Sequence, residues 1–127
     1  MYPDDLKYHP EHTWARIEGD TATVGITYYA QDQLGEIVFL ELPEVGTEVK
    51  AGEPFGEIES VKSVSDVYSP VNGEIVETNP EVVEAPEIIN EDCYGKGWMI
   101  KVKLADPSGV EDLLDAAAYE KLVSEQG

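Results

Sequence analysis

Lys62 stands at the centre of an octapeptide, ESVKSVSD, whose two halves nearly mirror each other. Short β-rich runs on both sides predict a hairpin of residues 57–61 and 64–68, with Lys62 and Ser63 as its two turn residues. These two residues are not an Asn-Gly or Asp-Gly pair, so turn stability does not account for them. The mirror would set Val61 against Val64, Ser60 against Ser65 and Glu59 against Asp66.

An exposed lysine in a tight turn offers an unhindered primary amine that a modifying enzyme can acylate. Once acylated, the side chain would be the root of a long arm. Like charges at Glu59 and Asp66 would disfavour strand pairing, which indicates a role other than stability. We expect the modifying enzyme to recognise Glu59, Ser60, Val61 and Asp66. A solvated turn residue explains most single lysines, so the surrounding sequence has to support this interpretation.

The elements that would position this hairpin are mainly short strands. Residues 36–42 alternate, which predicts Ile37, Phe39 and Glu41 on one side of a strand and Val38, Leu40 and Leu42 on the other. Glycines separate the β-rich runs, as turns and bulges require. The other strands are predicted at 12–18, 21–26, 49–50, 54–61, 64–68, 74–77 and 98–104.

Helices are predicted to be few and short. Thr27 can cap a helix of residues 28–34 that ends at Gly35. The stretch 79–92 contains two prolines and is predicted to be irregular, with a turn or two of helix. Two C-terminal helices are expected within 108–125. The first starts from the capping-box spacing of Ser108 and Glu111 and runs to about Leu114, and the second is capped by Asp115.

Length and composition favour one folded domain, because 42% of the 127 residues are hydrophobic. No apolar run approaches the roughly 18 residues of a membrane span, and the N-terminus lacks the features of a signal peptide. Cys93 is the only cysteine, so we expect no internal disulfide and a cytoplasmic protein. Neither His9 nor His12 has a second metal ligand at suitable spacing, so we expect neither a metal site nor catalytic residues.

The charge is strongly negative, with 8 Lys and Arg against 27 Asp and Glu and a formal net charge of −19. This balance argues against binding to nucleic acids and to anionic membranes. In dilute buffer such a charge repels itself, whereas 1 M salt screens it over about 3 Å. We hypothesise an origin in a high-salt cytoplasm. The alternative is an ordinary acidic protein with a large solvated face.

The segment 56–79 around Lys62 resembles the lipoyl-attachment region of the glycine cleavage system H proteins. The similarity extends over residues 6–123, in the order expected for that family. The matching motifs are His12-Thr-Trp14, Val24-Gly-Ile-Thr27, Leu34-Gly-Glu-Ile-Val38, Leu42-Pro-Glu-Val-Gly46, Pro86-Glu-Ile-Ile-Asn90 and Tyr94-Gly-Lys-Gly-Trp-Met-Ile-Lys101.

This resemblance implies a mostly β, flattened barrel and sandwich hybrid of the hammerhead, lipoyl-domain type, with short helices. It implies a single lipoyl-carrier domain, 1–127, with its β core at about 12–104 and its C-terminal helices at 108–125. The implied cofactor is lipoic acid, bound covalently as N6-lipoyllysine at Lys62. The implied protein is a monomeric carrier and not an enzyme.

The resemblance also implies the partners. The carrier would take the aminomethyl group of glycine from a pyridoxal-phosphate glycine decarboxylase to a tetrahydrofolate-dependent aminomethyltransferase. Dihydrolipoyl dehydrogenase would then reoxidise it, and a lipoate ligase or lipoyl transferase would attach the lipoyl group. The family is thought to fold the loaded arm into a groove on its own surface, for which His12, Ser65 and Asp66 are candidate lining residues.

Two residues depart from the family pattern. Thr13 stands where the family often has Glu, so a role of that carboxylate in holding the arm does not carry over. Cys93 stands where the family usually has Pro. Its thiol could exchange with a dithiol arm, although a half-buried filler is the simpler interpretation.

Other carriers remain as alternatives. A biotinyl carrier usually has Met-Lys-Met, which Val61-Lys62-Ser63 does not match. Lipoyl domains of 2-oxo acid dehydrogenases typically have Asp-Lys-Ala and lack a C-terminal helical tail. A lipoate relay protein that serves the lipoylation of other enzymes would share the fold. A related protein that has lost the modification is disfavoured by the intact Lys62.

Overall fold

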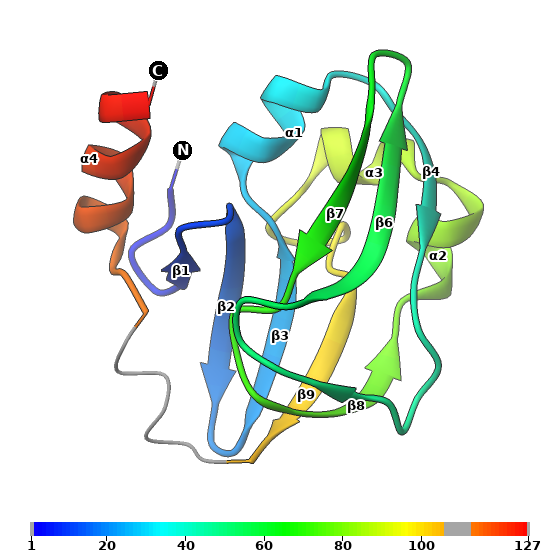
Figure 1. Ribbon diagram of the computed structural model, residues 1–127, viewed down its shortest axis with the longest axis vertical. Helices are drawn as coiled ribbons and strands as arrows, with labels where there is room; N and C mark the ends of the chain where they lie inside the picture. Colours follow the sequence, from blue (N-terminus) through cyan, green and yellow to red (C-terminus); the bar gives the residue numbers. More distant parts are fainter. Residues whose placement is uncertain (1, 106–112, 127) are drawn as a thin grey trace.

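The computed structural model describes residues 2–105 and 113–126, and within them nine strands form two antiparallel sheets flanked by four helices (Figure 1). The strands are β1 (Lys7–His9), β2 (Thr13–Glu18), β3 (Thr21–Ile26), β4 (Ile37–Glu41), β5 (Glu48–Val49), β6 (Pro54–Ser60), β7 (Val64–Tyr68), β8 (Gly73–Thr78) and β9 (Ile100–Leu104). The helices are α1 (Tyr28–Leu34), α2 (Pro80–Glu84), α3 (Glu87–Glu91) and α4 (Ala116–Gln126).

The larger sheet has the order β1-β2-β3-β9-β8-β5, and the smaller sheet has the order β4-β6-β7. Apolar residues of both sheets form the main core, including Val24, Leu40, Ile58, Ile75 and Val102, all at most 1% exposed. Burial of these branched side chains is the principal force that holds the sheets together. The sheets do not close into a barrel. The predicted mostly β, flattened two-sheet fold with short helices is confirmed.

Helix α1 forms as the sequence predicts. The Thr27 side chain accepts a hydrogen bond from the Ala30 N–H, and Gly35 ends the helix with φ 79°. A positive φ is favourable for glycine because it has no Cβ. The stretch 79–92 contains two single-turn helices, α2 and α3, the first of them capped by the Asn79 side chain.

Strand β4 departs from simple alternation. A register irregularity between Ile37 and Phe39 inserts one extra residue in its pairing with β6. Ile37 and Leu40 are therefore both buried, whereas Phe39 is 43% exposed. The prediction that Ile37, Phe39 and Glu41 share one side was wrong, because a bulge interrupts the two-residue period of a strand.

The C-terminal helix α4 packs on a second apolar cluster beside β1. Asp115 caps it by accepting a hydrogen bond from the Ala118 N–H at 2.8 Å, and Tyr119 is fully buried. Most of the other predicted C-terminal helix, 108–112, lies outside the described residues. Its expected end, Leu114, forms an antiparallel bridge with Tyr8 and is not helical. None of the helices in the described ranges is long and apolar enough to cross a membrane.

Candidate functional site

The hairpin that carries Lys62 projects from the smaller sheet, at the end opposite the β2–β3 turn (Figure 1). Four residues, 60–63, separate the last pair of facing residues in β6 and β7, instead of the two that the sequence mirror predicts. The three pairs that the mirror predicts, Val61–Val64, Ser60–Ser65 and Glu59–Asp66, were therefore wrong. The observed pairs are Glu59 with Val64, Ile58 with Ser65, and Glu57 with Asp66.

Ser60 is the reason for the longer turn. Its Oγ accepts hydrogen bonds from the N–H groups of Lys62 and Ser63, both at 3.1 Å. Its own N–H donates to the Ser63 carbonyl at 2.8 Å. A serine that bonds to the next residues of the backbone supports a turn without the Asn-Gly pair that a two-residue hairpin needs. Ser60 therefore shapes the loop from which the lysine projects.

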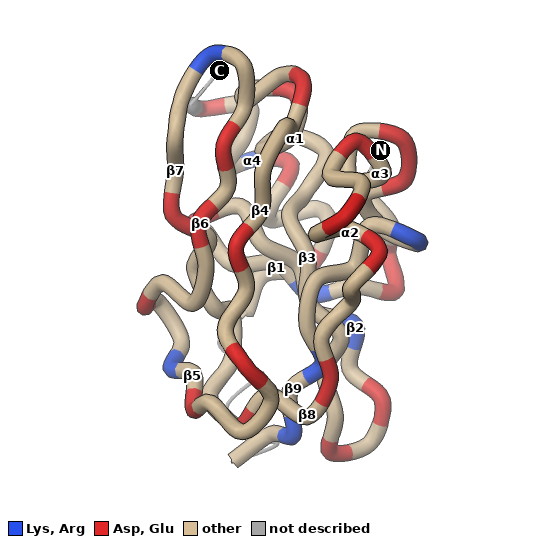
Figure 2. The backbone as a smooth tube through the Cα atoms, turned by 90° about the vertical axis from the view of Figure 1, so that its right-hand side faces the viewer, with Lys and Arg blue, Asp and Glu red and all other residues tan. Residues whose placement is uncertain are grey.

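Lys62 is exposed, and its amine is free of carboxylate partners. Within residues 2–105 and 113–126 the only ion pair joins Lys101 and Glu77, at 3.9 Å. Acidic segments follow β4 and the hairpin below its single basic tip (Figure 2). Val61, the residue before Lys62, is 66% exposed, and its N–H donates to the Glu36 carbonyl at 3.1 Å. The loop is thus anchored to the main body, and the amine stays accessible to an enzyme.

A cavity of about 170 Å³ lies beside the edge strand β7, between β7 and α1. It brings together His12, Ser65 and Asp66, the three residues that the sequence proposes for an arm groove. Its apolar lining suits an aliphatic chain, and it comes from Ile26, Ala30, Leu34, Ile58 and Val67. The structure thus places these three candidate residues around one cavity.

Thr13 lines the same cavity and is 1% exposed. Its Oγ1 is the one buried side-chain polar atom of the described residues that lacks a hydrogen-bond partner. Buried polar atoms are normally satisfied, so an unsatisfied one marks a place where a bound group can contribute a hydrogen bond. Thr13 therefore adds one polar atom to an otherwise largely apolar part of the cavity lining.

His12 has a backbone conformation that is rare for a residue with a side chain, with φ 71°. Its N–H donates to the His9 carbonyl at 2.9 Å, and its carbonyl accepts from the Thr27 N–H at 3.1 Å. The ring lies 4.6 Å from the Tyr29 ring. Strain of this kind persists only where surrounding contacts fix it, and it is often found at functional sites.

Cys93 does not belong to this cavity. It is 6% exposed, and burial raises the pKa of its thiol to about 12. A protonated thiol is a poor nucleophile for disulfide exchange. Its carbonyl accepts a hydrogen bond from the Trp14 indole at 3.0 Å. These contacts support the structural interpretation of Cys93 and not a redox role.

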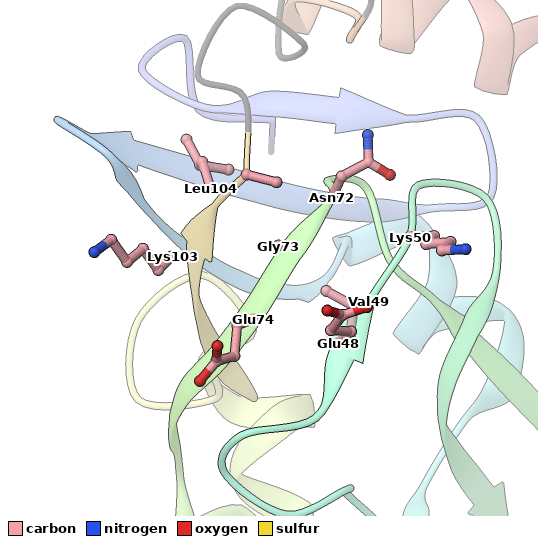
Figure 3. Close-up of a pocket in the computed structure, with 9 residues that line it drawn as sticks. Glu48, Val49, Lys50, Asn72, Gly73, Glu74, Lys103 and Leu104 are labelled. Carbon is pink, nitrogen blue, oxygen red and sulfur yellow. The ribbon is translucent and has the colours of Figure 1, made fainter.

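A larger hollow, of about 440 Å³, lies at the opposite end of the molecule, between β5, β8 and the end of β9 (Figure 3). Lys50 and Lys103 project away from each other there, and Glu48 and Glu74 accompany them. The mixed charges do not converge on one point. The described residues contain no cluster of His, Cys, Asp or Glu that could hold a metal ion.

Comparison with known proteins identifies the family. The family model described as glycine cleavage H-protein matches residues 6–126. The chain belongs to the glycine cleavage H-protein family. A relative from Symbiobacterium thermophilum, named glycine cleavage system H protein, is 54% identical over 97% of this chain and 96% of its own length. A relative from Carboxydothermus hydrogenoformans with the same name is 53% identical over 100% of this chain and 98% of its own length.

The fold agrees with that of a solved H protein. The crystal structure of a glycine cleavage system H protein from Mycobacterium marinum superimposes with a TM-score of 0.88 at 42% identity. The match covers 96% of this chain and 98% of that one. This H-protein family member therefore has the family fold over nearly its whole length.

Several residues in or beside the cavity are not predicted from the sequence. Glu11 and Tyr29 line it, and Tyr119 contacts the His12 ring from α4. Glu11 is next to His12, so its position adjacent to a candidate residue was an available signal. Tyr119 is 107 residues away from His12, and no spacing in the sequence indicates that contact.

Proposed function

We propose that this chain is the lipoyl carrier of a glycine cleavage system, with lipoic acid joined through an amide bond to Nζ of Lys62. Membership of the H-protein family supports the system to which it belongs. The observation that carries the residue assignment is the exposed, unpaired amine of Lys62 at an anchored hairpin tip. Once bound, the lipoyl group supplies a disulfide that accepts the aminomethyl group and electrons.

The residues of the hairpin have two tasks in that function. The Ser60-based turn presents Lys62 to the enzyme that forms the amide bond, and we propose that this enzyme recognises Glu59, Ser60, Val61 and Asp66. The exposed hairpin lets the same lysine enter the sites of a decarboxylase, an aminomethyltransferase and a dehydrogenase in turn. Tethering raises the local concentration of the group at each docked site.

We further propose that the cavity beside β7 shelters the arm between these visits. Its apolar lining would cover the aliphatic chain and exclude water. A primary amine is protonated at neutral pH, so the Asp66 carboxylate, with Glu11 nearby in the lining, can hold the cationic end. Thr13 Oγ1 offers one further hydrogen bond.

Intact-mass spectrometry of protein purified from its natural host tests the assignment, with Lys62→Arg as the matched variant. We expect a lipoyl-sized mass increment in the natural chain and none in the variant. A biotin-sized increment, or an increment that survives in Lys62→Arg, would overturn it. Glycine–bicarbonate exchange with the reconstituted system then separates a glycine carrier from a lipoate relay, which would be lipoylated but inactive in exchange.

A further inference from the structure

Tyr119 connects the C-terminal helix to the cavity beside β7. Its hydroxyl lies 2.7 Å from Nδ1 of His12 and 2.7 Å from Oγ1 of Thr27. Tyr119 and Thr27 are both fully buried. The aromatic ring of Tyr119 stacks on Tyr8 at 4.8 Å, so its hydroxyl has a fixed position.

The three polar groups form a chain with one favourable order of protons. Thr27 Oγ1 already accepts a hydrogen bond from the Ala30 N–H at 3.3 Å, so its own proton can be donated to the Tyr119 oxygen. Tyr119 then donates to Nδ1 of His12. The reverse order would leave the Thr27 proton without an acceptor in a buried site, which costs free energy. The favourable order makes Nδ1 an acceptor and leaves the proton of neutral His12 on Nε2.

His12 needs such a constraint because its ring lines the cavity. The backbone of His12 is held at φ 71° by hydrogen bonds on both sides. The Tyr29 ring supports one part of the imidazole at 4.6 Å. The Tyr119 hydroxyl contacts one particular ring nitrogen, Nδ1, and so favours one of the two tautomers, which backbone bonds and ring packing do not distinguish.

We propose that Tyr119 is a positioning residue, which fixes the orientation and the Nε2–H tautomer of His12 in the cavity that receives the arm. This inference rests on the proposed carrier function. It gives α4 an indirect role in the cavity, through His12, in addition to covering the second apolar cluster. Tyr119 itself does not line the cavity, so it acts through His12.

Nitrogen-15 NMR of the histidine rings in the full, unmodified chain tests the tautomer at about pH 8, above the ordinary histidine pKa of about 6.5. In the natural protein we expect His12 Nδ1 to have the shift of an unprotonated nitrogen and Nε2 that of a protonated one. Tyr119→Phe keeps the stacked ring and should move the two shifts toward each other. A protonated Nδ1 in the natural protein, or an unchanged spectrum in Tyr119→Phe, overturns the proposal.

Tyr8→Phe is the matched control. Tyr8 is equally buried, its ring stacks on that of Tyr119, and its hydroxyl donates to the Pro3 carbonyl at 2.7 Å and not to His12. A purely structural role for the hydroxyls predicts the same His12 spectrum for both variants. If Tyr119→Phe does not fold, Thr27→Ala removes the proton donor at the other end and should also mix the tautomers.

A second measurement connects the tautomer to the arm. Each variant is lipoylated at Lys62, charged with the aminomethyl group, and followed by release of formaldehyde in the absence of partner enzymes. Release should be about fivefold faster in Tyr119→Phe, the factor that a typical hydrogen bond represents, and unchanged in Tyr8→Phe. Equal release from both variants overturns the role of Tyr119. A natural chain that cannot be lipoylated overturns the carrier function instead, and the NMR comparison tells these failures apart.

Discussion

The side chain of Lys62 lies over Gly35, the residue that ends α1. A Cβ atom at position 35 would stand 3.2 Å from Cε and 3.6 Å from Nζ of the lysine. Gly35 also has φ 79° and ψ −148°, a conformation that essentially only glycine adopts. The end of α1 thus provides a surface, free of side-chain atoms, on which the stem of the lysine rests.

Gly35→Ala should therefore lower stability and displace Lys62 at the same time. We expect a loss of about 1–3 kcal/mol in the free energy of unfolding from the strained backbone, and a slower initial rate of lipoylation. Gly19→Ala is the control, because Gly19 has φ 63° with no atoms within 4 Å of the added Cβ. It should lose stability and be lipoylated at the normal rate. Equal lipoylation of both variants would contradict the contact.

Ser60→Ala removes the side chain that organises the turn. The loss of its hydrogen bonds should cost about 0.5–1.5 kcal/mol of stability and slow lipoylation, because Lys62 would then project from a less ordered loop. Ser63→Ala is the control, since Ser63 contributes its backbone and not its hydroxyl to the turn. Denaturant unfolding and mass spectrometry during lipoylation measure both effects. Identical behaviour of the two variants would exclude a specific role for Ser60.

Asp66→Asn should weaken protection of the charged arm, because it removes a carboxylate from the cavity while preserving size. Formaldehyde release from the charged protein should become faster by about tenfold, as expected for loss of a charge-assisted hydrogen bond of roughly 1.5 kcal/mol. Glu57→Gln removes the carboxylate opposite Asp66 on β6, which does not line the cavity. A similar increase in Glu57→Gln would point to net charge and not to the cavity.

His9 should make the protein less stable as the pH falls below about 6.5. Burial lowers the pKa of His9 in the folded state, and its Nδ1 accepts the Glu11 N–H at 3.0 Å. The unfolded chain therefore binds a proton at a higher pH than the folded chain, and stability is lost until the pH passes the folded pKa. His9→Gln should flatten this slope in melting temperatures between pH 7.5 and 5.5. A slope that is unchanged in the variant would exclude His9 as its source.

Salt should raise the melting temperature from low to molar concentration. The net charge is −19, and the described residues contain only the exposed Lys101–Glu77 ion pair to offset it. Screening reduces repulsion among the carboxylates more than it weakens this one pair. Melting temperatures measured by circular dichroism over a series of sodium chloride concentrations test this prediction. A flat response would also remove the basis for a high-salt origin.

The sequence by itself determined the local elements and the reactive residue. Thr27 and Gly35 mark the ends of α1 because capping depends on side-chain oxygens and positive φ within a few residues. Lys62 was identifiable because the residues around it form a continuous motif. Hydrophobic periods likewise located most strands to within one or two residues.

The tertiary structure alone decided the hairpin register, the bulge in β4 and which other residues line the cavity. The register depends on the Ser60 hydrogen bonds and does not follow the mirror symmetry of the sequence. His12 lines one cavity with Asp66 and contacts Tyr119 because packing of sheets and helices brings distant residues together. Such contacts are set by burial of the whole core, a property that no short stretch of sequence contains.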